Sequence, residues 1–418
     1  MTERTTCAIV GGGPAGMMLG LLLARAGVEV TVLEKHADFL RDFRGDTVHP
    51  STLQLLDELG LGERFARLPQ SKVRELAFTT EQGDRLIIGD LGRLKVAHPY
   101  IAMVPQWDLL DLLAAAGKEE ETFSLRMSTE VTELLVEGGA ARGVNYRTAA
   151  GDTGQLRADL TVACDGRWSL ARTSAGLRPK EHPSPIDVWW FRLPRHDGDS
   201  EGTLGPTLRS GEVAVSIPRE GYFQVGYMIA KGRETALRAE GIERFRARIA
   251  ACMPQFADRV HTLESMDDVK HLDVRLNRLP RWHQPGLLCI GDAAHAMSPV
   301  GGVGINLAVQ DAVAAAHELA RPLRQGRVTG RTLDRVRGRR LLPTAAVQAV
   351  QRMLHRAVIA PTIEGRRSGP PKPLARMLRY VPQLSTVPAH LIGVGFRPEH
   401  APTYARRTPG QGRGDQLP

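Results

Sequence analysis

The chain has 418 residues, 42% hydrophobic and 24% charged, and 55 Lys plus Arg against 46 Asp plus Glu give it a net charge of +9. These are ordinary globular values, which exclude collagen, coiled coil and disorder throughout, and the length allows two or three domains or one large interleaved unit. The last 98 residues hold 19 basic and 4 acidic side chains, a net of +15, and the first 320 hold 36 and 42, a net of −6. The final 58 residues hold 10 of the 27 prolines, so we expect a loosely structured, basic, Pro-rich extension over 361–418.

The cysteine spacing and the N-terminal residues indicate the cellular compartment in which we expect the protein. The cysteines lie far apart, with no Cys-x-x-Cys pair and no Cys/His ligand spacing: Cys7, Cys164, Cys252 and Cys289. We therefore expect neither a disulfide framework nor a metal site. Met1–Thr6 is polar, unlike a signal peptide, and the apolar run Met17–Ala24 is well short of the roughly 18 residues of a membrane span. The expectation is a cytoplasmic protein with no membrane span.

The strongest local pattern begins at residue 7, where a strand-like run precedes Gly-Gly-Gly-Pro-Ala-Gly and an apolar helix. Gly11 permits the tight turn, Gly13 lets the main chain approach a pyrophosphate, and Gly16 lets the helix pack on the strand. The next strand-like run ends in Glu34, 18 residues beyond the last glycine, where a carboxylate can accept hydrogen bonds from a ribose diol. A glycine triplet alone also fits a structural turn, but both strands and the terminal acid together predict a dinucleotide-binding site.

Two further strand-like runs end in an aspartate. One leads into Gly291-Asp292 and is followed by Pro299 and a glycine-rich helix start at 301–306. This arrangement would place main-chain N–H groups and a helix dipole around an electron-rich ring and a polyol. The other run leads into Asp165 and a glycine, which also fits a plain turn.

Together these segments resemble the single-component flavoprotein hydroxylases, the aromatic monooxygenases related to para-hydroxybenzoate hydroxylase and the ubiquinone-pathway hydroxylases. The resemblance runs from residue 7 to about 350. It implies an α/β fold in which a Rossmann-like FAD-binding domain is interleaved with a β-sheet substrate domain and followed by C-terminal helices. The implied division is an FAD-binding domain of 1–70, 98–180 and 275–360, a substrate-binding sheet domain of 71–97 and 181–274, and the extension 361–418. Homodimers are common in this family.

The resemblance also assigns cofactor-binding residues. The implied set is Gly11, Gly13, Pro14, Ala15 and Gly16 at the pyrophosphate; Glu34 at the ribose, with Lys35 beside it; Arg44 and Gln106 at the flavin; Val131 near adenine; Asp165 at a position shared by FAD and NAD(P)H; Asp292 at the ribityl chain; and Pro299, Gly302, Val303, Gly304, Ile305 and Asn306 around the isoalloxazine. A surface salt bridge would also explain Arg44, and a helix cap would explain Gln106. The sequence has no second glycine fingerprint for a nicotinamide nucleotide, and it does not choose between NADH and NADPH.

Residues 180–280 contain short alternating strands, such as 188–192 and 221–229, which predict a sheet with two unlike faces. In the family that the chain resembles, this sheet covers the substrate over the isoalloxazine, and a further piece comes from residues 71–97. The alternation does not decide which face of the sheet meets the flavin. A role in core packing would also explain each aromatic ring. The candidate substrate residues are His49, Trp190, Tyr222, Gln224 and Met228.

The resemblance implies an FAD-dependent monooxygenase that uses NAD(P)H and O2 to hydroxylate an aromatic or phenolic small molecule through a flavin C4a-hydroperoxide. We assign no catalytic residue, because the cofactor carries the chemistry and the protein excludes water and positions the ring. His295 is interpreted as a structural histidine.

Two alternatives remain open. The first is another flavin oxidoreductase of the same fold, a halogenase, prenyl reductase or dehydrogenase, although residues 188–194 lack the spacing of the halogenase element Trp-x-Trp-x-Ile-Pro. The second is a non-catalytic protein that binds flavin or nucleic acid through its basic end. Helix-turn-helix, zinc-finger and basic-zipper patterns are missing from the sequence, so a solvated helix face better explains the arginines of 321–340, and no nucleic-acid partner is expected.

Overall fold

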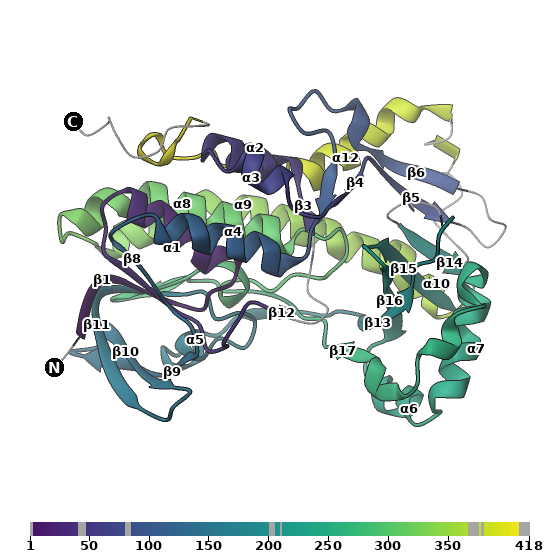
Figure 1. The fold of residues 1–418 in the computed structure, drawn as a ribbon, viewed down its shortest axis with the longest axis horizontal. Coiled ribbons are helices and arrows are strands. Elements are labelled where there is room, and N and C mark those ends of the chain that lie inside the picture. The colour runs from purple at the N-terminus through teal and green to yellow at the C-terminus, as the bar shows by residue number, and fades with distance from the viewer. Residues whose placement is uncertain are drawn as a thin grey trace.

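The computed structural model describes residues 3–40, 47–79, 85–199, 205–209, 211–366, 376–377 and 380–408. Arg44, one of the expected flavin contacts, lies outside these ranges. Figure 1 shows a parallel sheet and an antiparallel sheet at opposite ends of the molecule, with long helices spanning the distance between them. The fold is therefore built in two parts that the chain visits more than once.

The parallel sheet has the strand order β19-β20-β11-β1-β2-β8; in addition, β10 pairs antiparallel with the long strand β11, and β9 pairs antiparallel with β10. Its strands are β1 Glu3–Val10, β2 Val30–Leu33, β8 Phe123–Arg126, β9 Thr129–Glu137, β10 Ala140–Thr148, β11 Thr153–Ala163, β19 His283–Gln284 and β20 Leu287–Cys289. All four residues of β2 are buried, and so is the end of β1 from Cys7 to Val10. Continuous apolar runs of this kind are expected where both faces of a parallel sheet are covered.

Helices cover one face of this sheet and the β9–β10 hairpin lies on the other (Figure 1). The helices are α1 Pro14–Arg25, α4 Gln106–Lys118 and α8 Gly304–Arg324, with α9 Gly330–Leu354 packed along α8. Every residue of α1 from Ala15 to Ala24 is buried, because the helix lies between the sheet, α4 and α8. Pro14 begins the helix with its φ already near the helical value, and Gly27 follows its end with a positive φ of 73°.

The antiparallel sheet has the order β17-β13-β16-β15-β14-β5-β6. Its strands are β5 Glu75–Thr79, β6 Arg85–Asp90, β13 Ile186–Pro194, β14 Pro206–Arg209, β15 Glu212–Pro218, β16 Tyr222–Ala230 and β17 Lys270–Leu272. One face packs on the helix α7 Ile242–Cys252, where Phe245 meets Trp189 edge-to-face with ring centroids 5.3 Å apart. Phe223 and Tyr227 belong to this covered face, so the alternate residues Trp190 and Gln224 lie on the opposite one.

Two small sheets and several short helices join the two parts. They are β3 Thr47–Val48, β7 Ile101–Met103 and β4 Ser71–Val73; β12 Lys180–His182 and β18 Leu276–Arg278; and α2 Pro50–Glu58, α3 Gly62–Ala66, α5 Leu170–Ser174, α6 Glu234–Arg238, α10 Ala360–Ile363 and α12 Thr386–Gly393. β5 and β6 join the antiparallel sheet, whereas β4 pairs with β7, in the order β3-β7-β4. The expected third piece of the substrate sheet therefore begins at β5 and not at residue 71.

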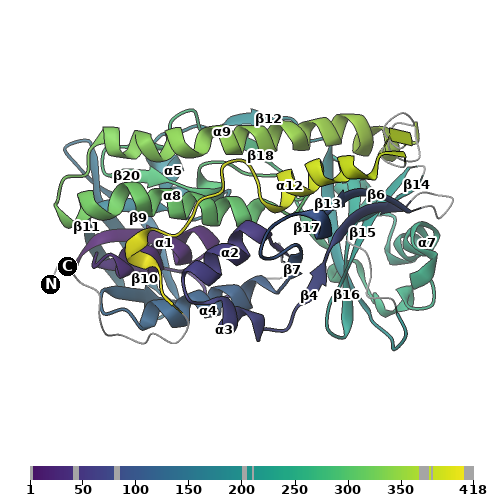
Figure 2. The ribbon, with the colours of Figure 1, turned by 90° about the horizontal axis from the view of Figure 1, so that it is seen from above.

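The C-terminal segment, residues 380–408, corrects the expectation of a loosely structured extension. It runs back beside α8 and α9 toward α2 (Figure 2), and it buries Ala389, Ala401 and Ala405 completely or nearly so. The Ala401 N–H donates to the Glu58 carboxylate at 2.7 Å, and Tyr404 Oη donates to the Ala316 carbonyl at 3.1 Å. Small side chains in this segment let its main chain lie close against the helices.

The arginine-rich stretch is also less uniform than a solvated face. Arg340 on α9 is only 1% exposed, because the helix turns this side chain toward α8 and into a buried ion pair with Asp311. No helix within the described ranges is long and apolar enough to cross a membrane. The same residues contain no group of three or more His, Cys, Asp or Glu side chains able to hold a metal ion.

Candidate active site

Four expected cofactor segments meet at one edge of the parallel sheet. The glycine turn follows β1, Glu34 follows β2, Asp165 follows β11 and Asp292 follows β20, and these strands are direct neighbours in the order β20-β11-β1-β2. Because the strands are parallel, their carboxyl ends lie at the same edge, where open α/β sheets bind ligands. Segments as far apart in sequence as Gly11 and Asp292 thus contribute to one site.

The three glycines of the first turn have three different structural roles. Gly11 has φ +101°, and a methyl group there would lie 2.6 Å from the Cys164 carbonyl oxygen. A methyl group at Gly16 would lie 2.0 Å from the Gly11 carbonyl oxygen, so α1 can pack on the turn only with glycine at this position. A methyl group at Gly13 would meet no protein atom within 4 Å. The open space lies at the N-terminus of α1, where main-chain N–H groups and the helix dipole favour a phosphate.

Glu34 is buried beside this turn. Its Oε2 accepts a hydrogen bond from the Gly12 N–H at 2.9 Å, and its Oε1 accepts one from the His36 N–H at 3.1 Å. The start of β9 lies alongside, because the Thr129 N–H donates to the Glu34 carbonyl at 2.8 Å. The carboxylate is thus fixed in orientation at the end of β2.

Asp165 and Asp292 follow neighbouring strands, and Arg172 connects the loops that carry them. Asp165 Oδ2 accepts the Ala171 N–H at 3.1 Å, whereas its buried Oδ1 has no partner among the described residues. Burial raises the pKa of this carboxyl group, and hydrogen bonds from Ser169 and nearby main-chain N–H groups only partly oppose it. Arg172 donates to the Ala293 carbonyl at 3.1 Å and to the Arg167 carbonyl at 2.7 Å, and so ties the two loops together.

The loop from Ser298 to Gly302 is held from both sides. On one side, Thr47 Oγ1 donates to the Gly302 carbonyl at 2.5 Å. On the other, the Gln351 side chain on α9 accepts the Ser298 N–H at 3.2 Å and donates to the carbonyls of Ser298 at 2.8 Å and Val300 at 2.9 Å. Two supports from opposite directions fix this loop ahead of α8, so its main chain is preorganised.

The face of the antiparallel sheet opposite α7 packs against its surroundings at two places. Ile217, paired across from Gln224, packs against the cluster that contains Met103, and Met103 pairs with the Thr47 that holds Gly302. At the other end of the sheet, Met228 packs against the cluster that contains Val358, as does Leu354 at the end of the helix that carries Gln351. The face between these two contacts carries the candidate substrate residues Trp190, Tyr222, Gln224 and Met228 together.

Two of these side chains carry unpaired N–H donors. Gln224 is 4% exposed, and neither its Nε2 nor Trp190 Nε1 has a hydrogen-bond partner in the described part of the chain. The Trp190 ring lies over Gly226, where a methyl group would come within 2.8 Å of it. Buried N–H groups normally have a partner, so this face suits a ligand that offers an acceptor.

His49 lies apart from that face, which corrects its expected place in the substrate pocket. Its side chain is fully buried, and Nδ1 lies 2.7 Å from the Ile392 carbonyl oxygen while Nε2 lies 3.0 Å from the Gly302 carbonyl oxygen. Burial lowers the pKa of His49, and the two carbonyl contacts only partly oppose this. His49 therefore connects the C-terminal segment to the loop instead of lining a pocket.

The remaining expected cofactor residues occupy varied positions. Gln106 is the first residue of α4 and Lys35 is exposed just after β2. Val131 lies inside β9, where its side chain belongs to the core. Asn306 turns its side chain toward α2, where Ser51 Oγ donates to its Oδ1 at 3.1 Å. Only the main-chain atoms of Val131 therefore remain for a ligand, and the Oδ1 atom of Asn306 is occupied by α2.

Sequence reasoning missed a buried polar network behind the loops. His295 Nε2 lies 2.5 Å from Asp311 Oδ2, which also accepts the Gly291 N–H at 3.1 Å, and Arg340 Nε donates to Asp311 Oδ1 at 3.0 Å. His295 thus contacts Asp311 in the core, in keeping with a structural role. The sequence offered no pattern for this network, because its members come from the loop after β20, from α8 and from α9.

His355 is a second residue that the sequence did not single out. It begins the π-helical segment His355–Ile359, and its Nε2 lies 2.8 Å from Ser298 Oγ. Burial lowers the pKa of His355 to about 4, so the ring is neutral at pH 7. Such π-helical turns occur often at functional sites, and this one places an imidazole against the loop.

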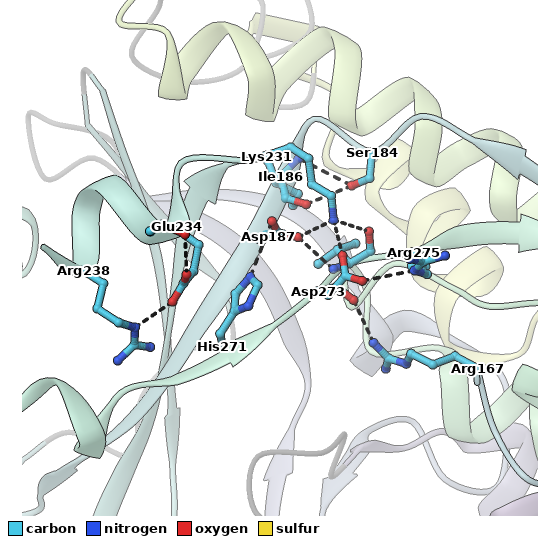
Figure 3. Close-up of polar contacts among 12 residues, drawn as sticks. Arg167, Ser184, Ile186, Asp187, Lys231, Glu234, Arg238, His271, Asp273 and Arg275 are labelled. Carbon is cyan, nitrogen blue, oxygen red and sulfur yellow. Dashed lines mark hydrogen bonds and ion pairs between the residues drawn. The ribbon is translucent and has the colours of Figure 1, made fainter. Parts of the chain in front are cut away.

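A polar cluster ties the cofactor edge to the antiparallel sheet (Figure 3). Lys231 Nζ at the end of β16 lies 2.6 Å from the buried Asp187 carboxylate on β13, and it also contacts Asp273. Asp273 in turn pairs with Arg275 at 3.1 Å, and its carbonyl accepts a hydrogen bond from Arg167 at 3.0 Å. Because Arg167 follows the Asp165 turn, this chain of contacts sets the distance between the two sheets.

The site has the features that FAD requires. The glycine turn leaves open space at a helix N-terminus for a pyrophosphate, and the acids after β2 and β20 stand on either side of it for a ribose and a polyol. The unpaired Asp165 Oδ1 offers one further acceptor to a ligand hydroxyl. These residues fit a long dinucleotide laid along the sheet edge.

Comparison with known proteins agrees with this geometry. Residues 4–350 match the family model described as FAD binding domain. The 6-methylpretetramide 4-monooxygenase of Streptomyces rimosus is 36% identical over 386 residues, covering 90% of this chain and 88% of the relative. The para-nitrophenol 4-monooxygenase of Pseudomonas sp. strain WBC-3 is 26% identical over 335 residues, covering 78% and 80%.

Solved structures share the fold. The OxyS anhydrotetracycline hydroxylase from Streptomyces rimosus superposes with a TM-score of 0.74 at 25% identity, covering 94% of this chain and 76% of that one. The probable FAD-dependent monooxygenase pqsL from Pseudomonas aeruginosa has a TM-score of 0.72 at 22% identity, covering 87% and 98%. The chain belongs to the FAD binding domain family. Within it, the protein is an FAD-dependent monooxygenase that hydroxylates an aromatic substrate, with NAD(P)H as co-substrate typical of these enzymes.

Proposed function

We propose that this monooxygenase hydroxylates a polycyclic aromatic polyketide. The observation that carries the proposal is the 36% identity to the 6-methylpretetramide 4-monooxygenase over nearly the whole length of both chains. The face of the antiparallel sheet opposite α7 supports it, because Trp190 and Met228 lie on it together, are only partly buried and suit contact with fused rings. We also propose that the enzyme is a cytoplasmic homodimer, which light scattering of the purified protein would test.

The proposed cofactor site takes FAD along the sheet edge. The pyrophosphate lies at Gly11, Gly13 and the start of α1, the ribose at Glu34 and the ribityl chain at Asp292. When bound, the flavin supplies hydride acceptance and oxygen activation. Loop residues 299–306 hold the ring with main-chain groups, which is the part of the site that Thr47 and Gln351 make rigid. Domain limits of 1–70, 98–180 and 275–360 for this part, and 181–274 for the substrate part, remain our proposal, whereas the expected substrate piece 71–97 joins that sheet only from β5 onward.

The proposed substrate site lies between this loop and the sheet face opposite α7. Trp190 and Gln224 would donate their unpaired N–H groups to a carbonyl or phenolate oxygen of the substrate. Gln224 lies two residues from Gly226, the cross-strand partner of Trp190, so both donors lie on one face of adjoining strands. Donation to a phenolate oxygen would stabilise the electron-rich form of the ring that accepts oxygen.

The activity is tested directly with the purified protein. We expect a flavin spectrum, oxidation of NADH or NADPH that is stimulated by a tetracyclic phenol such as anhydrotetracycline more than by para-nitrophenol, and one atom from labelled O2 in the product. Stimulation by the single-ring phenol alone would overturn the polycyclic proposal. Halide-dependent product formation, or reduction without oxygen uptake, would overturn hydroxylation itself.

Replacing Gln224 with leucine tests the substrate contact. We expect the substrate dissociation constant to rise about tenfold or more, because the variant loses a buried hydrogen bond to an oxygen that carries charge. Perturbation of the flavin spectrum on substrate addition measures this constant. Gln155→Leu, on an exposed position of β11, is the matched control. Equal affinity in Gln224→Leu and the control would remove Gln224 from the substrate site.

A further inference from the structure

The C-terminal segment, residues 380–408, contacts the residues that hold the flavin loops. His49 lies between two carbonyl oxygens, that of Ile392 in the segment and that of Gly302 in the loop. Ser51 repeats this arrangement two residues further on, at the start of α2, because its Oγ lies 3.5 Å from the Gly393 carbonyl oxygen and donates to Asn306. At two places, a single side chain thus contacts both the C-terminal segment and the region of the loop and the start of α8.

A third connection, between charged groups, runs through Glu399. Arg339 Nε lies 2.9 Å from each Glu399 carboxylate oxygen, and Arg339 Nη2 donates to Oε2 at 2.6 Å. Arg340 Nη1 lies 3.6 Å from Glu399 Oε1, while its Nε is bonded to Asp311 on the other side. The Glu399 N–H is also held, by the Gln310 side chain. Glu399 itself is 6% exposed, so little water screens these charges.

The far end of this network is the turn before Asp292. Asp311 accepts the Gly291 N–H and so fixes the start of this turn, where Gly291 has the positive φ of 60° that glycine adopts without strain. The buried Asp311 carboxylate is itself held by contacts with Arg340 and His295. Arg340 in turn stands between two carboxylates, and neutralising Glu399 would leave it with Asp311 alone.

We propose that Glu399 is a positioning residue for the cofactor loop, acting through Arg340 and Asp311 on the turn at Gly291. The inference rests on the proposed placement of the ribityl chain at Asp292. It gives the segment 380–408, which lies beyond the family match over 4–350, a part in binding FAD.

The test is the release of FAD from the holoenzyme on dilution, followed by the rise in flavin fluorescence. We expect Glu399→Gln to release FAD about fivefold faster or more, since the isosteric change removes one charge from a coupled network. Glu58→Gln is the matched control. It weakens the anchoring of the same segment at Ala401 and His400, and Glu58 does not contact Arg340 or Asp311.

The second arm is a double-mutant cycle with Asp311→Asn. If Glu399 acts through Asp311, adding Glu399→Gln to Asp311→Asn leaves the release rate unchanged within about twofold, because the connection is already broken. Equal release from Glu399→Gln and Glu58→Gln would overturn the proposal, as would multiplicative effects in the double variant. A wild-type protein that binds no FAD would contradict the cofactor site itself, a separate failure.

Discussion

Replacing Gly13 with alanine is expected to leave the free energy of unfolding of the FAD-free protein within about 0.5 kcal/mol of wild type, yet to weaken FAD binding at least about tenfold. The φ of Gly13 is −73°, which alanine adopts without strain, and its methyl group would enter open space. That space is where we place the pyrophosphate. Urea unfolding and titration of the apoprotein with FAD measure the two quantities separately.

Gly16→Ala is the matched contrast, because there the fold itself depends on glycine. Its methyl group would lie 2.0 Å from the Gly11 carbonyl oxygen, so α1 must move off the turn, at a cost of about 3 kcal/mol or more. We expect both stability and FAD affinity to fall in this variant. Unimpaired FAD binding by Gly13→Ala would place the phosphate elsewhere on the sheet edge.

Replacing Asp311 with alanine is expected to lower the free energy of unfolding by about 3–5 kcal/mol, because it leaves the buried Arg340 guanidinium without its hydrogen-bonded carboxylate. Urea unfolding of the FAD-free protein measures this effect. Asp159→Ala, which breaks only the exposed ion pair with Arg4, is the control and should change stability by less than about 1 kcal/mol. A loss below about 1 kcal/mol for Asp311→Ala would mean that the network contributes little to the fold.

The same carboxylate predicts a pH dependence. Burial acts to raise the pKa of Asp311, but the charges of His295 and Arg340 outweigh it and hold the pKa below its usual value. A carboxyl group with a lowered pKa in the folded state contributes stability above the ordinary value of about 3.9, and that contribution is lost as the pH falls through the folded-state pKa. The stability difference between wild type and Asp311→Ala should therefore be constant near neutral pH and shrink in acid below about pH 4.

Much of the cofactor edge could be predicted from sequence because its signals are local. A strand that ends in glycines or an acid and leads into a turn is a pattern of a few residues, and the right-handed crossover rule then brings such ends to one edge of a parallel sheet. Gly11, Glu34, Asp165 and Asp292 follow four neighbouring strands for this reason. Even the separate roles of Gly11, Gly13 and Gly16 agree with what a methyl group would meet at each.

In the substrate sheet, local sequence patterns were not sufficient to assign the two faces. Alternation along β16 separated Gln224 and Met228 from Phe223 and Tyr227, but the sequence could not say which set faces α7. The packing of Phe245 decided it, because that ring comes from a helix in another part of the chain. His49 illustrates the same limit: its residue type suits a polar pocket, and only its two carbonyl neighbours reveal a connecting role.

By itself, the sequence determined the strand ends that meet at the proposed FAD-binding edge and the mildly acidic body that carries them. Tertiary structure alone decided the role of the basic C-terminal quarter, where Arg340 is buried between Asp311 and Glu399 while its neighbours on α9 reach solvent. The physical reason is that the cost of burying a charge depends on partners that the chain supplies from distant segments. The amino-acid composition includes the charge of Arg340, but only the packing of α8, α9 and residues 380–408 shows that this charge lies between Asp311 and Glu399.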